Sequence, residues 1–234
     1  NCVSEKVVKV SSTRAAEMTK LLENTFRAAN IGLINEMAIL CKQLNLDIWE
    51  IIEAAKTKPY GYMPFYPGPG LGGHCIPVDP RYLEWKLETL NSESKYIKLS
   101  EEINFSMPQY VIDRAKEIIS TNNLKNELKI IGATYKKDVS DIRESPAIDI
   151  MQLLSDQKIP FSYHDPYINK IEIDSKIYYS ESLEDINYNN VLGIIVTDHS
   201  SYNWATISRN FNFIFDTRNA LRNFVGNDVN IYKL

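Results

Sequence analysis

The sequence predicts two domains of different class: an all-helical domain over residues 1–121 and a Rossmann-like parallel α/β domain over residues 122–234. Two observations carry this prediction. Apolar residues recur at helical spacing through a long stretch without proline near the N-terminus, whereas after Asn122 short apolar runs alternate with helical stretches. With 234 residues and 44% hydrophobic content, the chain is long enough for each domain to bury its own core.

The helical domain should begin with one long helix. Ser12 or Thr13 can cap it, and apolar positions continue at helical spacing to about Leu44: Met18, Leu21, Leu22, Phe26, Ile31, Ile34, Met37 and Cys41. Such a helix would span roughly 45 Å, so part of it should pack against a second subunit in a homodimer. Before it, residues 7–10 form a short apolar run that predicts a strand, and Asn1 in place of methionine indicates a chain entered midway.

Further helices are expected at residues 48–56, 80–91 and 95–121, the last of them bent or broken near Pro108. Between the first two lies a run of aromatic residues, prolines and glycines at residues 60–80. Four of the nine glycines in the chain lie between Gly68 and Gly73. The backbone there must adopt conformations or close approaches that side chains forbid.

The α/β domain should contain four strands, at residues 129–135, 161–164, 191–197 and 211–215. Helices are expected from Pro146, around Ser182 and after Tyr202. Ser145 followed by Pro146 is a favourable helix start, a cap and then a first-turn proline. Residues 136–144 would then form the loop beyond a strand's carboxyl end, which is where open parallel sheets bind ligands.

Charge and composition argue against several classes of partner. A net charge of -4, with acids and bases mixed along the chain, provides no basic stripe for nucleic acid. No apolar run reaches the length of a membrane span and no signal-peptide pattern occurs, so we expect a cytoplasmic protein without a membrane partner. The cysteines Cys2, Cys41 and Cys75 are odd in number and widely spaced, which fits neither a disulfide framework nor a metal cluster.

The segment from Gly68 to Gly73 matches the spacing G-x-G-x-x-G of a dinucleotide-binding turn, but we do not assign it to NAD. That fingerprint needs a preceding strand and a following helix, whereas prolines flank this segment on both sides. The stretch instead presents Cys75 on a loop, with Asp79 four residues later. Backbone N–H groups of the glycines could hold a sugar or an oxyanion. The alternative is a glycine-rich turn with a buried, inert cysteine.

Residues 70–80, Gly-Leu-Gly-Gly-His-Cys-Ile-Pro-Val-Asp-Pro, resemble the active-site segment of the UDP-sugar and GDP-sugar 6-dehydrogenases. Residues 16–24, with Asn35 and Glu36, are similar to the central helix of that family, and residues 135–146 resemble its nucleotide-domain loop. The resemblance covers the chain from about Val7 to Leu221. Residues 56–67 further resemble the branch acting on UDP-N-acetylglucosamine, which supplies uronic acids for bacterial surface polysaccharides such as capsule and O-antigen.

The resemblance implies an NAD-dependent, four-electron oxidation of the C6 alcohol of a UDP-sugar to a uronic acid. It implies that Cys75 holds the aldehyde as a thiohemiacetal and then as a thioester. Lys20 and Asn24 would stabilise the oxyanion, and Asp79 would position or deprotonate the attacking water. Taken without the resemblance, Lys20 and Asn24 are a solvated helix face and Asp79 is a helix cap. The NAD-binding Rossmann domain would precede these residues, so the chain alone should not turn over.

The resemblance also implies a substrate site. Gly70, Gly72 and Gly73 would approach the substrate. The loop carrying Tyr135, Lys136 and Arg143 would close over the UDP-sugar, where cations suit the diphosphate. Arg218, which follows a predicted strand, is a weaker candidate of the same kind. The alternative for the cations is an exposed charged loop.

Several points stay open in the sequence. We assign Cys41 to core packing, Cys2 to no role, and neither His164 nor His199 to any function; His74 departs from the UDP-glucose branch, with an open effect on sugar choice. UDP-glucose, UDP-N-acetylmannosamine and UDP-N-acetylgalactosamine are alternative substrates. The rival from another class is a catalytically silent module for sugar-nucleotide binding or dimerisation, against which the intact candidate catalytic residues argue.

Overall fold

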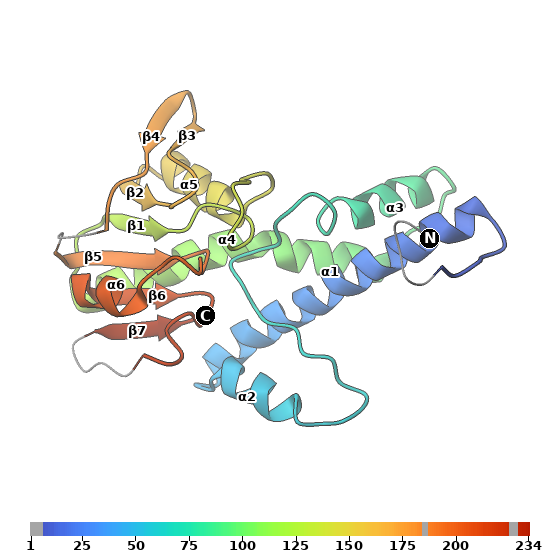
Figure 1. The fold of residues 1–234 in the computed structure, drawn as a ribbon, viewed down its shortest axis with the longest axis horizontal. Helices are drawn as coiled ribbons and strands as arrows, with labels where there is room; N and C mark the ends of the chain where they lie inside the picture. The colour runs from blue at the N-terminus through green and yellow to red at the C-terminus, as the bar shows by residue number, and fades with distance from the viewer. Residues whose placement is uncertain (1–6, 184–186, 225–228) are drawn as a thin grey trace.

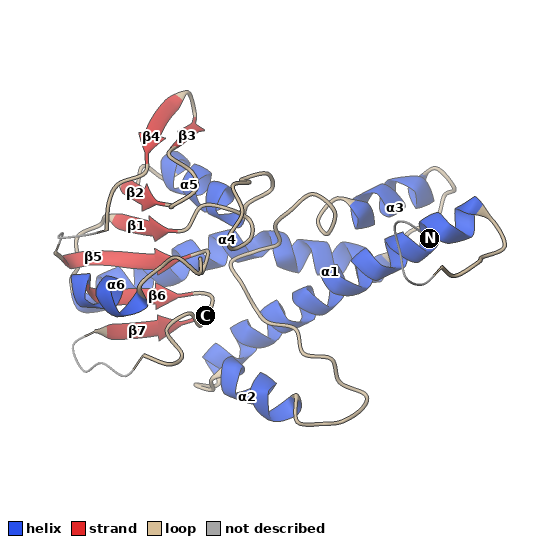
Figure 2. Ribbon diagram, viewed as in Figure 1, coloured by secondary structure: helices blue, strands red, loops and turns tan. Residues whose placement is uncertain are grey.

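A helical part and an α/β part are joined along one long helix, α4 (Figure 1). The computed structural model describes residues 7–183, 187–224 and 229–234. In the helical part α1 packs against α4, and α4 continues to the sheet (Figure 1). The strands lie together in the other half of the molecule (Figure 2). The predicted fold class, helical domain first and parallel α/β domain second, is confirmed.

The helices of the first part begin and end close to the predicted positions: α1 spans Thr13–Gln43, α2 Ile48–Ala55, α3 Asp79–Glu88 and α4 Lys95–Asn122. The Ser12 hydroxyl accepts a hydrogen bond from the Ala15 N–H at 3.2 Å and so caps α1. None of the helices in the described residues has the length and apolar character needed to cross a membrane.

One expectation for the helical part is wrong, and of the two alternatives at Pro108, a bend or a break, the break is wrong. Residues 7–10 are exposed and do not form a strand, because no described strand pairs with them and a lone strand has no ladder to stabilise it. Helix α4 is continuous across Pro108, where a break was one expectation. Pro108 and its neighbours Met107 and Val111 are buried, and this packing offsets the hydrogen bond that proline cannot donate.

The sheet has five parallel strands in the order β2-β1-β5-β6-β7. The strands are Leu128–Ile131 (β1), Phe161–His164 (β2), Tyr188–Ile195 (β5), Phe211–Asp216 (β6) and Asn230–Lys233 (β7). Strands β2 and β5 lie on opposite sides of β1, so the order of strand addition reverses there. The carboxyl ends of β1 and β5 therefore flank the switch point at which open α/β sheets bind ligands.

Alternate residues of the strands enter different cores on the two faces of the sheet. Ile130 and Ile194 belong to a core that also contains α4 residues and helix α5, Pro146–Asp156. Ile131 and Ile195 point into a smaller core with helix α6, Trp204–Asn210. The larger core also contains buried α4 residues from Met107 to Ile119, so the end of the helical part packs directly against the sheet. The predicted domain boundary between residues 121 and 122 therefore stays a prediction.

The α/β part differs from expectation in three places. Strand β1 ends at Ile131 and not at residue 135, because Gly132 with φ +85° turns the chain out of the sheet. A β3–β4 hairpin, Lys170–Ile173 and Lys176–Tyr179, and the edge strand β7 were not predicted. The helix expected around Ser182 is not present at residues 181–183, and residues 184–186 lie outside the described residues.

Candidate functional site

The loop that carries Cys75, residues 67–78 (here the cysteine loop), contains no strand and leads into α3 at Asp79. The Cys75 side chain is exposed. The backbone carbonyl of Cys75 accepts a hydrogen bond from the Asp79 N–H at 2.9 Å. The context of a dinucleotide-binding turn is therefore missing, as the flanking prolines indicated. An exposed thiol at a turn is available to a substrate, and the alternative of a buried cysteine is wrong for Cys75.

Two of the predicted catalytic residues meet in the structure. Asn24, on α1 and only 1% exposed, donates a hydrogen bond from its amide to the Asp79 carboxylate. The Asn24 carbonyl oxygen in turn accepts from the Arg27 guanidinium at 2.8 Å. Asp79 is the first residue of α3, and its side chain makes no capping bond, so the interpretation of Asp79 as a helix cap is wrong.

Lys20 lies one turn before Asn24 on α1 and has a different partner. Its ammonium group is 3.5 Å from the Glu23 carboxylate, and both side chains are more than half exposed. In this arrangement Lys20 is a solvated cation on the helix surface. Its predicted contact with a developing oxyanion is not seen in the chain by itself and stays a prediction.

The glycines of the cysteine loop are required by the protein around them. A Cβ on Gly73, whose φ is +91°, would lie 2.8 Å from Cε2 of Tyr135, and one on Gly72 would lie 2.8 Å from Cβ of Tyr135. A Cβ on Gly70 would lie 3.2 Å from Cβ of Pro146. The predicted close approach is thus made to the α/β domain. Substrate contacts by the N–H groups of Gly70, Gly72 and Gly73 stay a prediction.

On its other side, the cysteine loop is tied to the helical domain. The buried Gly68 N–H donates to the Asn35 side-chain oxygen at 2.9 Å. The Asn35 amide donates to Asn104 of α4, also at 2.9 Å, and the Asn104 amide donates to the Ala28 carbonyl at 3.0 Å. This buried chain of hydrogen bonds holds the start of the cysteine loop between α1 and α4.

The loop beyond β1, residues 132–145, brings Tyr135, Lys136 and Arg143 to the switch-point edge of the sheet. Lys136 is exposed. Arg143, with a side chain 67% exposed, pairs with Asp141 through Nε and one terminal nitrogen at 2.7 to 3.1 Å. Hydrogen bonds from the Arg143 side chain and N–H lower the pKa of Asp141 to about 2. Ser145 caps α5 ahead of Pro146 as predicted.

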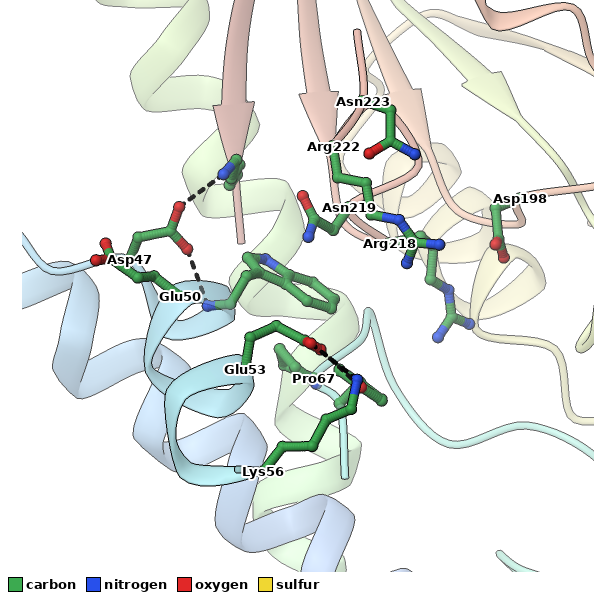
Figure 3. Close-up of a pocket in the computed structure, with 13 residues that line it drawn as sticks. Asp47, Glu50, Glu53, Lys56, Pro67, Asp198, Arg218, Asn219, Arg222 and Asn223 are labelled. Carbon is green, nitrogen blue, oxygen red and sulfur yellow. Dashed lines mark hydrogen bonds and ion pairs between the residues drawn. The ribbon is translucent and has the colours of Figure 1, made fainter. Parts of the chain in front are cut away.

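Arg218, beyond β6, lines a cavity of about 710 Å³ between α2 and the carboxyl ends of β6 and β7 (Figure 3). Its Nε donates to the Val196 carbonyl at 2.8 Å, and a Cβ on Gly68 would lie 2.6 Å from its guanidinium. Burial lowers the pKa of Arg218, against the nearby carboxylates of Asp198 and Asp216. The structure therefore places Arg218 against the cysteine loop.

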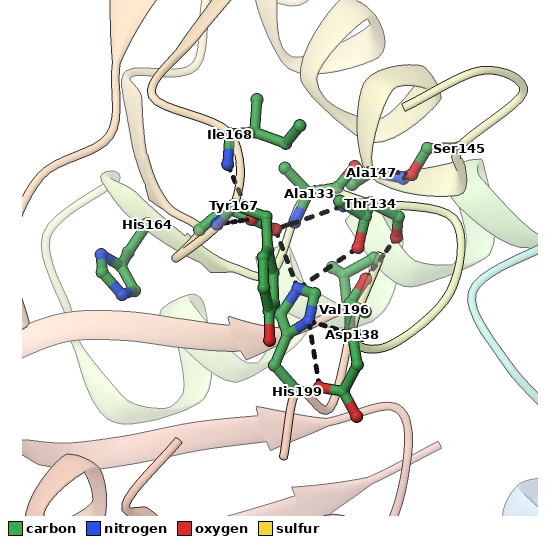
Figure 4. A network of polar contacts seen from close by, with 12 residues as sticks. Ala133, Thr134, Asp138, Ser145, Ala147, His164, Tyr167, Ile168, Val196 and His199 are labelled. Carbon is green, nitrogen blue, oxygen red and sulfur yellow. Dashed lines mark hydrogen bonds and ion pairs between the residues drawn. The ribbon is translucent and has the colours of Figure 1, made fainter. Parts of the chain in front are cut away.

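The sequence did not indicate a role for His199, which lies at the centre of a buried polar network (Figure 4). Its Nε2 is 3.0 Å from Asp165, and its Nδ1 accepts from the Asp138 N–H at 3.0 Å. His199 follows β5 and Asp165 follows β2, so their position after strands was the available signal. Cys41 packs in the core around α2 as predicted, whereas Cys2 lies outside the described residues.

Comparisons with known proteins match both parts of the chain. The central-domain model of the UDP-glucose/GDP-mannose dehydrogenase family matches residues 14–106, and its UDP binding domain model matches residues 129–223. A UDP-N-acetyl-D-mannosamine dehydrogenase from Methanocaldococcus jannaschii is 34% identical over 92% of the chain and 49% of that protein. An NDP-N-acetyl-D-galactosaminuronic acid dehydrogenase from Ralstonia nicotianae is 36% identical over 64% of the chain and 34% of that protein.

A solved structure has the same fold. The UDP-N-acetyl-mannosamine dehydrogenase from S. aureus superposes with a TM-score of 0.77 at 38% identity, covering 95% of this chain and 51% of that one. The chain spans about half the length, or less, of these relatives.

Proposed function

The chain belongs to the UDP-glucose/GDP-mannose dehydrogenase family, and from this membership we propose that it is the catalytic and substrate-binding part of an NAD-dependent nucleotide-sugar 6-dehydrogenase. The reaction is the four-electron oxidation of the C6 alcohol of a UDP-sugar to the uronic acid. The observation that carries the proposal is the contact between Asn24 and Asp79 beside the exposed Cys75. It brings the buried amide of Asn24 on α1 to a carboxylate that lies four residues after the exposed thiol.

In the proposed mechanism Cys75 is the nucleophile. Its thiolate adds to the C6 aldehyde to give a thiohemiacetal, and oxidation of this adduct gives a thioester that water hydrolyses to the carboxylate. NAD supplies the oxidant for both oxidations. No strand precedes the glycines of the cysteine loop, so we propose that NAD binds outside the described residues and that the chain alone should not turn over.

The remaining candidate residues support the nucleophile. We propose that Asp79 positions the attacking water and that Asn24, through its hydrogen bond, fixes the orientation of the Asp79 carboxylate. Lys20, on the same face of α1, would turn from Glu23 to the developing oxyanion when substrate is present. Because an exposed ion pair contributes little to stability, breaking it costs little.

The mechanism is tested by Cys75→Ser in the complete enzyme, which includes an NAD-binding domain. Uronate formation should be lost, because an alkoxide neither forms nor leaves as readily as a thiolate. Cys41→Ala is the matched control, since this thiol packs in the core around α2 and its loss should spare the chemistry. Unimpaired uronate formation in Cys75→Ser would refute covalent catalysis.

For the substrate we propose UDP-N-acetylglucosamine. Residues 56–67 support this choice, while the relatives named above are a UDP-N-acetylmannosamine and an N-acetylgalactosaminuronic acid dehydrogenase. An acetamido sugar is common to all of these. NADH formation by the complete enzyme with a panel of UDP-sugars tests the choice, and a preference for UDP-glucose or for another acetamido sugar would overturn it.

The chain by itself should bind UDP but bind NAD barely at all. The loop of residues 132–145 supplies Tyr135, Lys136 and Arg143 at the switch point, and Arg218 lies beyond the neighbouring strand β6. In calorimetry, Arg143→Ala should weaken UDP binding by about 1.5 kcal/mol, the lower end for a hydrogen bond to a charged group, because Arg143 is exposed.

Arg209→Ala is the control for that measurement, since it removes an exposed arginine from the last turn of α6 without touching the loop. Tight NAD binding without a response to UDP would contradict the assignment of both domains.

We also propose that the chain forms a homodimer through α1. An exposed apolar stripe follows one side of this helix: Met18, Leu22, Phe26, Leu33, Met37 and Leu40. Leu22 is 66% exposed, which is costly for a leucine in water. Light scattering should give a dimer that Leu33→Glu converts to a monomer, whereas Lys42→Glu on the opposite side leaves it intact. A monomeric wild-type chain at micromolar concentration would refute this.

A catalytically silent module for nucleotide binding or dimerisation remains the second candidate for the chain as it stands. The exposed stripe on α1 supports its capacity to dimerise. It is distinguished from the enzyme by the complete protein: a silent module would bind UDP-sugars and form the same dimer, yet produce no uronate in any member of the panel.

A further inference from the structure

His199 is too deeply buried to touch a substrate, yet it organises the loop that the proposed function assigns to UDP. Its side chain is fully buried, with 0% exposure, and it contacts groups from two other loops at the carboxyl edge of the sheet. Those groups are Thr134 and Asp138 beyond β1, and Asp165 beyond β2. His199 itself lies beyond β5, so one ring joins both sides of the switch point.

The hydrogen bonds fix the tautomer of this ring. The Asp138 N–H can only donate, so His199 Nδ1 accepts and carries no proton. The proton is on Nε2, which donates to Asp165 at 3.0 Å and lies 3.2 Å from the Thr134 hydroxyl oxygen. That hydroxyl donates onward to the Lys136 carbonyl at 2.8 Å. One ring nitrogen of His199 therefore accepts a hydrogen bond and the other donates one.

Asp165 is held as an acceptor. Burial raises the pKa of its carboxyl, but hydrogen bonds from His199 and from the N–H groups of Ala133 and Tyr167 lower the pKa more, and the net shift is downward. One oxygen receives the Ala133 N–H at 2.7 Å, and the other receives the Tyr167 N–H at 2.8 Å. Asp165 thus fixes both the start of the loop and the orientation of His199.

The far end of the loop adopts a conformation that needs this support. Asp138 has φ +62°, in the left-handed region, which costs a side-chain-bearing residue free energy. Its carboxylate accepts from the Ser200 N–H at 2.8 Å and from the Ser200 hydroxyl at 2.6 Å, while its own N–H donates to His199. Without the His199 acceptor, this N–H would lose its hydrogen-bond partner within the protein.

Between these two fixed ends lies Tyr135, which reaches the cysteine loop. The Tyr135 N–H donates to the Asp141 carbonyl at 3.1 Å. Its ring covers Gly73 so closely that an added Cβ there would lie 2.8 Å from Cε2. Gly73 is two residues before Cys75. A shift of the loop therefore displaces the surface on which the cysteine loop rests.

We propose that His199, clamped between Asp165 and the Asp138 N–H, is a positioning residue that sets the loop of residues 134–138 and, through Tyr135, the placement of Cys75. The inference rests on the proposed function in one respect, that this loop binds UDP. Binding of the nucleotide at the loop would then be transmitted to the nucleophile through a packed ring, with no hydrogen-bonded relay to the thiol.

Hydrogen–deuterium exchange of the full chain tests the link without any ligand. His199→Ala should raise exchange about tenfold at residues 134–138, as expected when a net hydrogen bond is lost, and also at residues 73–79, where the Asp79 N–H bonds to the Cys75 carbonyl. His199→Asn should restore protection, because its side-chain oxygen can take the place of Nδ1. Tyr135→Ala should raise exchange at residues 73–79 while the Asp138 N–H stays protected.

Ile171→Ala is the control for simple loss of stability, since it empties a core position on the β3–β4 hairpin far from the loop in the chain. Unchanged exchange at residues 73–79 in His199→Ala, or equal changes in Ile171→Ala, would overturn the proposal.

Calorimetry with UDP separates this inference from the proposed function. If the loop binds UDP, His199→Ala should weaken binding about tenfold, and His199→Asn should recover most of the loss. Absence of UDP binding by the wild-type chain would refute the proposed role of the loop, while the exchange measurements would still decide whether His199 positions it.

Discussion

Gly73→Ala measures how tightly the cysteine loop is packed against the α/β domain. Two contributions can be worked from the structure. Gly73 has φ +91°, where a residue with a Cβ loses roughly 1 to 2 kcal/mol. Its new Cβ would also lie 2.8 Å from the Tyr135 ring, and overpacking of this kind typically costs about 1 to 3 kcal/mol. Together they predict a loss of roughly 2 to 5 kcal/mol in the free energy of unfolding.

Gly61 provides a matched control within the same chain. Its φ of +75° carries a similar backbone penalty, but an added Cβ would meet nothing within 4 Å. Gly61→Ala should therefore cost only about 1 to 2 kcal/mol. The difference between the two variants isolates the contact with Tyr135.

Urea unfolding followed by circular dichroism measures both losses, and an unchanged m-value shows that the unfolded states are comparable. In a Tyr135→Ala background the cost of Gly73→Ala should fall to that of Gly61→Ala, because the ring is gone. Equal losses for Gly61→Ala and Gly73→Ala in the wild-type background, or strict additivity with Tyr135→Ala, would refute the packing argument.

Asn35→Ala should lower the free energy of unfolding by about 2 kcal/mol, because it leaves the buried Gly68 N–H without an acceptor; urea midpoints measure this. Burial lowers the pKa of Lys129, so between its folded and unfolded values the unfolded chain binds more protons and stability should rise with pH. Lys129→Met should abolish that slope in unfolding experiments below pH 10.5. Arg218→Lys should weaken UDP binding measured by calorimetry, because lysine cannot both donate to the Val196 carbonyl and present a planar fork.

Three positions outside the buried core serve as controls for these variants. Asn30→Ala should change stability by less than about 0.5 kcal/mol, Lys125→Met should keep the alkaline slope, and Arg222→Lys on the same cavity wall should leave UDP affinity nearly unchanged. Losses in the controls equal to those in Asn35→Ala, Lys129→Met and Arg218→Lys would contradict the corresponding arguments.

Local patterns in the sequence were sufficient for most of the fold. The helices α1 and α4 and the cap formed by Ser145 and Pro146 depend on residues within a few positions of one another, and they appear where predicted. The hairpin β3–β4 was missed: Asp174 and Ser175, which join its two short strands, both have positive φ in the structure. There the residues are not the glycine and asparagine that usually mark such a turn.

For the candidate site, the sequence identified the residues but not their contacts. Cys75, Asn24 and Asp79 were identified in the sequence through a resemblance, yet only the structure shows that the Asn24 amide bonds to Asp79 across 55 residues. Lys20 and Arg143 were identified in the same way, and the structure pairs each with a neighbouring carboxylate.

By itself the sequence determined where most helices and the strands β1, β2, β5 and β6 form, because the periods of 3.6 and 2 residues are written locally. It also determined that the four glycines of the cysteine loop must adopt conformations or make close approaches that side chains forbid. Only the tertiary structure decided which residues lie against those glycines. Tyr135 covers Gly73, and His199 meets Asp165 and Asp138, because the strand order β2-β1-β5 brings three loops to one edge of the sheet. No local pattern encodes strand order, which follows from packing both faces of the sheet at once.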